Sequence, residues 1–123
     1  MARKKNKAED VDENVSKPTI RSIKDFDSEV LDVEGDYVLV DFYADWCEYC
    51  KKMATIFSKL SSDFQNIIFL EMNIDDNQEV AEEYCEEGIP NLVLFKDGDV
   101  QSGFVGYDKI KAVKAWLVEA IKG

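Results

Sequence analysis

Two of the three cysteines, Cys47 and Cys50, stand three positions apart in the run Trp46-Cys47-Glu48-Tyr49-Cys50. On a helix, residues at this spacing share one face, with Cβ atoms about 5–6 Å apart, whereas a disulfide needs about 4 Å. The spacing suits a disulfide when the first cysteine lies at the helix start, where the backbone is not yet helical. Such a pair can exchange disulfides, supply half of a zinc site, or pack as core thiols.

The position of the pair in the chain favours redox chemistry over the other two interpretations. A predicted strand ends just before Cys47 and a predicted helix follows it. Unpaired amide N–H groups and the positive end of the helix dipole then stabilise a thiolate at Cys47. We therefore predict Cys47 as the attacking nucleophile and the more buried Cys50 as the resolving thiol. Zinc would need four ligands, but only Cys85 remains and the chain has no histidine.

The elements that must position the pair can be read from hydrophobic patterning. Residues Thr19–Ile23 suggest a short first strand, and Asp25 is the expected N-cap of a short helix that ends at Gly35. The nearly unbroken apolar run Tyr37–Tyr43 is typical of a strand covered on both faces. After the pair, one apolar stripe at helical spacing predicts a helix. Its members are Met53, Ile56, Phe57, Leu60 and Phe64.

The second half of the chain continues this alternation. We expect a strand at Ile67–Asn73, a short acidic helix at Asn77–Tyr84, and a break at Gly88-Ile89-Pro90. An Asp-Gly turn joins the strands Asn91–Phe95 and Val100–Val105 as a hairpin, and a last helix begins at Asp108. The order β-α-β-α-β-α-β-β-α predicts an α/β domain with a central mixed sheet of about five strands and helices on both faces. We assign residues 19–123 to this domain and residues 1–18 to a disordered polar tail.

Composition limits the classes of partner. The 123 residues carry 26 acids against 15 bases, a formal charge of −11. Such a surface repels phosphate backbones and anionic lipid, so we expect neither nucleic acid nor membrane partners.

The N-terminus does not have the pattern of a secretory signal. Its basic start, Arg3–Lys7, is followed by acids rather than by an apolar stretch. We expect a soluble, cytoplasmic, monomeric protein that binds no metal.

The residues around the pair resemble the thioredoxin family. That family has a strand ending in Val-Asp-Phe-(Trp/Tyr)-Ala, then an acidic residue, then Trp-Cys-x-x-Cys-Lys, and this chain has that pattern from Val40 to Lys51. Further matches follow in family order, at Phe26–Leu31, Asn73–Asp75, Gly88–Pro90, Phe95–Gly98 and Val105–Gly106. The resemblance covers about Thr19 to Lys122. It implies the thioredoxin fold and a protein-disulfide reductase of cell redox homeostasis, with a redox-active Cys47–Cys50 disulfide and no bound cofactor. It also implies disulfide-containing protein substrates and a thioredoxin reductase-like electron donor.

The resemblance gives Asp41 a role in proton transfer. In the family this strand aspartate lies beneath the disulfide and helps to move a proton from the resolving cysteine. Burial should raise the pKa of Asp41, and Glu71, which stands where the family often has a lysine, should raise it further. The alternative is a solvated strand acid.

The resemblance also implies a surface for substrate docking. Pro90 matches the family's cis-proline, and the backbone of Ile89 would pair with an extended substrate segment. Trp46 and Gly106 complete this surface. Without the resemblance, Pro90 would be a trans proline that opens a strand, Trp46 a packing residue and Gly106 a turn glycine.

The chain departs from the family inside the motif, where Glu48-Tyr49 replaces the usual Gly-Pro. The Glu48 charge opposes thiolate formation, while the extra amide N–H favours it, and our hypothesis is that the centre is reducing. Tyr49 before Cys50 leaves a glutaredoxin-like, glutathione-dependent reductase as an alternative. A non-catalytic interaction module is a second one. We expect Cys85 to be an idle thiol, against a regulatory or dimer-forming role.

Overall fold

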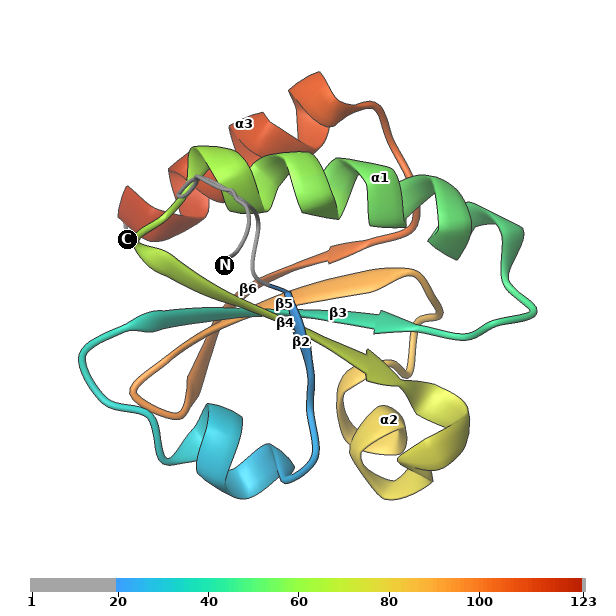
Figure 1. Ribbon diagram of the computed structural model, residues 1–123, viewed down its shortest axis with the longest axis horizontal. Coiled ribbons are helices and arrows are strands. Elements are labelled where there is room, and N and C mark those ends of the chain that lie inside the picture. Colours follow the sequence, from blue (N-terminus) through green and yellow to red (C-terminus); the bar gives the residue numbers. More distant parts are fainter. Residues whose placement is uncertain (1–19, 123) are drawn as a thin grey trace, which may run out of the picture.

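A five-stranded mixed sheet lies at the centre of the computed structural model, which describes residues 20–122 (Figure 1). The predicted tail, residues 1–18, lies outside the described residues. The strands are β2 (Arg21–Ser22), β3 (Tyr37–Tyr43), β4 (Ile67–Asn73), β5 (Asn91–Lys96) and β6 (Asp99–Val105). Their order across the sheet is β2-β4-β3-β5-β6. β4 is parallel to β2 and β3, and β5 is antiparallel to β3 and β6, so the predicted mixed sheet is confirmed.

Helices cover both faces of the sheet, as expected. The longer helices α1 (Glu48–Asp63) and α3 (Ile110–Lys122) lie together over one face (Figure 1). The π-helix η1 (Asp27–Leu31), the 3₁₀ turn η2 (Ile74–Asp76) and α2 (Gln78–Tyr84) lie on the other. None of the helices between residues 20 and 122 is long and apolar enough to cross a membrane.

The core has two layers, one on each face of the sheet, and β3 is buried between them. Successive side chains of a strand point to opposite faces. Leu39 therefore packs in the cluster beneath α1 and α3, while Val38 and Val40 pack in the cluster on the η1 and α2 side. The predicted stripe of α1 is buried in the first cluster, through Met53, Ile56, Phe57 and Leu60. Asp41 lies two residues after Leu39 and so points to the α1 face.

The first helix does not begin as predicted. Asp25 is not its N-cap, since η1 starts at Asp27 with Phe26 preceding it. The Glu29 carboxylate instead reaches back and accepts hydrogen bonds from the backbone N–H groups of Lys24 and Asp25, at 2.7 and 2.8 Å. These two N–H groups lower the pKa of Glu29. The first strand is also shorter than predicted, with only Arg21 and Ser22 in β2.

The hairpin between β5 and β6 forms at the predicted Asp-Gly turn. Asp97 and Gly98 both have positive φ, at 52° and 82°, as a type I′ turn requires. A Cβ at Gly98 would lie 2.6 Å from the carbonyl oxygen of Leu31, so the close approach of η1 also requires glycine here. The last helix begins two residues later than predicted, at Ile110.

Candidate active site

Cys47 and Cys50 lie at the start of α1, directly after the loop that leaves β3. Cys47 is the N-cap residue, with the extended backbone angles φ −96° and ψ 111°, and Cys50 is in the first helical turn. Their Cα atoms are 5.2 Å apart, and their Sγ atoms lie at disulfide distance. The Cys47 Sγ also accepts a hydrogen bond of 3.2 Å from the backbone N–H of Cys50. The backbone dipoles therefore point at the sulfur that is predicted to attack.

The two cysteines are shielded to different degrees. Cys47 is 9% exposed and Cys50 is 3% exposed, in a small cluster with Ala44. Tyr43, Ile74 and Ile89 pack against this cluster. The order of exposure agrees with the predicted roles, because the attacking sulfur must reach a substrate and the resolving sulfur needs to reach only Cys47.

Asp41 lies beneath the pair and is buried. Its side chain is 2% exposed, so the alternative of a solvated strand acid is wrong. Among the described residues its Oδ1 atom has no hydrogen-bond partner. Burial, and then the charge of Glu71, raise the pKa of Asp41 to about 7. Asp41 and Cys50 line one cavity of about 210 Å³.

Glu71 is the charged neighbour of Asp41 on the adjacent strand. The two residues are partners in the parallel register of β3 and β4, so they share one face of the sheet. Glu71 is half-buried, lines the same cavity, and accepts a hydrogen bond of 3.3 Å from the Ser22 hydroxyl. Two carboxylates in one cavity disfavour simultaneous ionisation.

We therefore expect Glu71→Gln to lower the pKa of Asp41 from about 7. The decrease should be less than about one pH unit, because burial is the larger cause of the raised value. A carboxyl NMR titration of the oxidised protein would measure it. Asp45→Asn is the matched control, since Asp45 lines the same cavity but is not among the charges that raise the pKa of Asp41. An unchanged titration in Glu71→Gln would contradict the coupling.

The residues assigned to substrate docking lie around the cysteines. The Ile89–Pro90 peptide bond is cis, as predicted. The backbone N–H of Gly106 donates a 2.7 Å hydrogen bond to the Pro90 carbonyl oxygen, so these two segments are adjacent. Trp46 is 67% exposed and is therefore not a core packing residue. Its indole N–H donates to Asp75 Oδ2 at 2.9 Å, which fixes the ring beside the cysteines.

The structure adds contacts around the Glu48-Tyr49 dipeptide that sequence reasoning missed. The Glu48 carboxylate pairs with the Lys51 ammonium at 3.1 Å, which partly offsets the charge expected to oppose the thiolate. The Tyr49 ring stacks on Tyr107, with ring centroids 5.8 Å apart. The Lys52 ammonium lies 5.2 and 5.8 Å from the centroids of these two rings. Of these contacts, only the Glu48–Lys51 ion pair could have been predicted from the sequence, because residues at i and i+3 are neighbours on a helix.

Cys85 lies away from the pair, at the end of α2. It is a half-buried free thiol that packs against the cluster on the η1 and α2 side. Burial, and then the charge of Asp41, raise the pKa of Cys85 to about 12, so its thiol stays protonated at neutral pH. This environment agrees with an idle thiol. Within residues 20–122 there is no group of three side chains that could hold a metal ion.

Comparisons with known proteins agree with this geometry. The family model described as Thioredoxin matches residues 17–119. A thioredoxin of Pseudomonas aeruginosa is 42% identical over 82 residues, which are 66% of this chain and 75% of that protein. Human thioredoxin is 43% identical over 84 residues, 68% of this chain and 80% of that protein. A crystal structure of a thioredoxin of Malassezia sympodialis has the same fold, with a TM-score of 0.76 at 24% identity, over 87% of this chain and 95% of that one.

Proposed function

Because this chain belongs to the thioredoxin family and is a protein thiol–disulfide oxidoreductase, we propose that it works in the reducing direction, as a cytoplasmic monomer. The position of Cys47 at the N-cap of α1, with Cys50 at disulfide distance, carries the thiol–disulfide exchange. In the reduced protein this position stabilises a thiolate at the more exposed of the two sulfurs. The likeness to proteins named thioredoxin supports the reducing direction.

The first step is attack on the substrate. The Cys47 thiolate attacks one sulfur of a substrate disulfide, forms a mixed disulfide, and releases the other substrate sulfur as a thiolate that takes up a proton. Trp46, Ile89, Pro90 and Gly106 are the proposed docking surface for the substrate. The proposal is supported by the exposed Trp46 ring, by the hydrogen bond between Gly106 and Pro90, and by the packing of Ile89 against the cysteines.

The second step releases the substrate. Cys50 must lose its proton before it can attack, and we assign the Asp41 carboxylate as the acceptor. The Cys50 thiolate then attacks the Cys47 Sγ, the mixed disulfide breaks, and the second substrate sulfur leaves as a thiolate. The substrate gains two electrons, and the protein is left with a Cys47–Cys50 disulfide. With a pKa of about 7, Asp41 is partly ionised at neutral pH and can both accept and return a proton.

A third step must return two electrons to the disulfide. We propose a thioredoxin reductase-like donor. We expect insulin disulfides to be reduced when NADPH is supplied with a thioredoxin reductase. When NADPH is supplied with glutathione and a glutathione reductase instead, the rate should be lower by about tenfold or more. NADPH consumption measures both rates. Glutathione is the control donor because it is the reductant of the glutaredoxin-like alternative. Turnover supported equally well by glutathione alone would contradict the proposed donor, and no turnover with either would contradict the reductase direction.

A further inference from the structure

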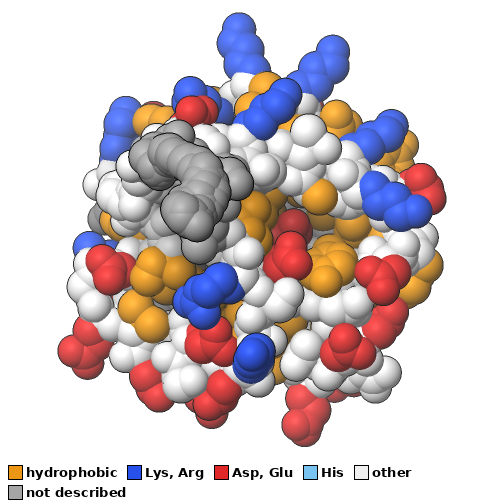
Figure 2. Space-filling view, viewed as in Figure 1, with side chains coloured by type: hydrophobic (Ala, Val, Ile, Leu, Met, Phe, Trp, Pro, Cys, Tyr) orange, Lys and Arg blue, Asp and Glu red, His pale blue; other side chains and the backbone are white. Residues whose placement is uncertain are grey.

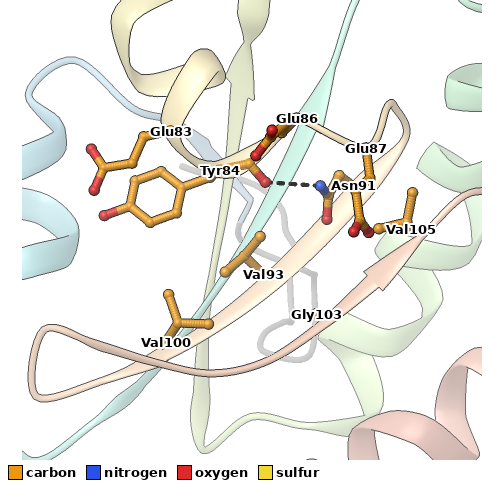
Figure 3. Close-up of a pocket in the computed structure, with 9 residues that line it drawn as sticks. All are labelled: Glu83, Tyr84, Glu86, Glu87, Asn91, Val93, Val100, Gly103 and Val105. Atoms are coloured by element: carbon orange, nitrogen blue, oxygen red, sulfur yellow. Dashed lines mark hydrogen bonds between the residues drawn. The ribbon is translucent and has the colours of Figure 1, made fainter.

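A groove beside the active site is not used by the chemistry described above. It lies between the end of α2 and the β5–β6 hairpin, and its volume is about 540 Å³ (Figure 3). Its floor is apolar and comes from the strands, through Val93, Val100 and Val105, with Gly103 between them. Val100 and Val105 are 51% and 44% exposed, so the floor is open to a ligand.

The groove is continuous with the proposed docking surface. Asn91 directly follows the cis-proline Pro90, and Val105 directly precedes Gly106. Asn91 and Val105 are partners across the β5–β6 register and line the same end of the groove. From Val105 to Val100 the floor runs five residues along β6, or about 16 Å, at roughly 3.3 Å per residue. A substrate segment that passes Pro90 can therefore continue along β6.

One wall of the groove is acidic. Glu83, Glu86 and Glu87 come from α2 and the loop that follows it, and all three are exposed. Within the part of the chain that the structure describes, none of these carboxylates forms a salt bridge. Asn91 donates a 3.0 Å hydrogen bond to the Tyr84 carbonyl oxygen, which holds this wall against the floor (Figure 3).

Acidic side chains also predominate on the half of the molecule that contains the groove. In Figure 2, Lys and Arg side chains stand mainly over α1 and α3, and Asp and Glu side chains mainly over the half that contains η1 and α2. The whole chain carries a formal charge of −11. A basic partner is therefore attracted over a distance and then held by the wall at contact.

We propose that this groove binds a basic and apolar segment of the substrate protein that flanks the disulfide to be reduced. Apolar side chains of the segment rest on Val100 and Val105, and Lys or Arg side chains pair with Glu86 and Glu87. The proposal deepens the proposed function and rests on it, because it names the class of disulfide protein that the reductase prefers.

The test compares three disulfide peptides of equal length. Their flanking segments alternate valine with lysine, with glutamine or with glutamate, and a fourth, short peptide has no flanks. The rate constant for oxidation of the pre-reduced full-length protein by each peptide would be measured by quenching and mass spectrometry. We expect the lysine peptide to react about tenfold faster than the glutamate peptide, which corresponds to about 1.4 kcal/mol.

The variants separate the groove from the net charge. Glu86→Gln/Glu87→Gln should reduce the ratio of lysine to glutamate peptide rates from about tenfold to about twofold or less, because exposed ion pairs are worth about 0.2–1 kcal/mol each. The matched control Glu82→Gln/Glu119→Gln removes the same charge from exposed residues outside the groove and should keep the wild-type ratio. Gly103→Leu should lower the ratio of flanked to short peptide rates, because a Cβ there meets only the Leu92 carbonyl oxygen, at 3.7 Å, and the added side chain fills the groove.

The outcomes are distinguishable. An unchanged lysine-to-glutamate ratio in Glu86→Gln/Glu87→Gln, with reduction intact, overturns the groove and leaves the reductase standing. If the wild type reduces none of the four peptides, the proposed function fails and the groove proposal fails with it. In full-length Lys4→Gln/Lys5→Gln, a rate constant that rises for the lysine peptide alone would mean that the basic run of this chain competes for the groove. That result would overturn the proposal that a substrate segment is the occupant.

Discussion

Replacing Cys47 with serine is expected to lower the rate of protein-disulfide reduction by at least about 10³-fold, as loss of a nucleophile does in other enzymes. The reason is that the thiolate, not the thiol, attacks a disulfide, and a serine hydroxyl does not ionise at neutral pH. A serine at this N-cap can accept the hydrogen bond that Cys47 accepts from the Cys50 N–H, but as a neutral hydroxyl that does not attack a disulfide. Insulin reduction, followed as turbidity with dithiothreitol as the reductant, would measure the loss.

The controls for this prediction use the other two cysteines. Cys85→Ser should retain nearly full activity, because Cys85 is half-buried, lies apart from the pair and stays protonated. Cys50→Ser should also stop turnover but should still form a mixed disulfide with the substrate. Substantial activity in Cys47→Ser would overturn the assignment of the nucleophile.

Replacing Asp41 with asparagine is expected to change how stability depends on pH. The pKa of Asp41 is raised from 3.8 to about 7 in the folded protein, so the folded state binds this proton more tightly than the unfolded state. The stability that the proton contributes is complete below pH 3.8 and is lost as pH rises to about 7. Between pH 5 and pH 8 the loss from this one residue should be about 2–3 kcal/mol.

Urea unfolding of the oxidised wild type and of Asp41→Asn, at pH 5 and pH 8, would measure this. The free energy of unfolding of the wild type should fall by about 2–3 kcal/mol more than that of Asp41→Asn between pH 5 and pH 8. The reason is that the amide of the variant does not titrate. Asp45→Asn is the control, because Asp45 is exposed. A difference between wild type and Asp41→Asn that is the same at both pH values would contradict the raised pKa of Asp41.

The same substitution should slow release of the substrate. Without Asp41, the carboxylates that remain in the cavity are the exposed Asp45 and the half-buried Glu71. We expect the attack of Cys50 on the mixed disulfide to slow by about tenfold or more. In the wild type this step should accelerate as pH rises through about 7, the pKa of Asp41. Rapid-quench measurement of the mixed disulfide would show the rise in the wild type and its absence in Asp41→Asn.

Local patterning was enough to predict the elements that hold the cysteines. β3 and β4 have the predicted bounds, Tyr37–Tyr43 and Ile67–Asn73, because an unbroken apolar run is a strong signal for a strand buried on both faces. The stripe of α1 was equally clear. The cis state of Pro90 could be predicted only through the family resemblance, because an isolated X–Pro sequence favours trans.

Contacts between distant segments could not be predicted in this way. The stack of Tyr49 on Tyr107 joins residues 58 positions apart, and the groove joins α2 to β6. Such contacts depend on how the elements pack, and hydrophobic periodicity carries no information about them.

The central claim is that Cys47 attacks and Cys50 resolves, and trapping the intermediate tests it most directly. Reduced Cys50→Ser would be mixed with a disulfide-containing protein, the free thiols alkylated, and the linked peptides mapped by mass spectrometry. We predict a stable adduct in which the substrate sulfur is bonded to Cys47. An adduct on Cys85, or none on Cys47 while the substrate is still reduced, would contradict it.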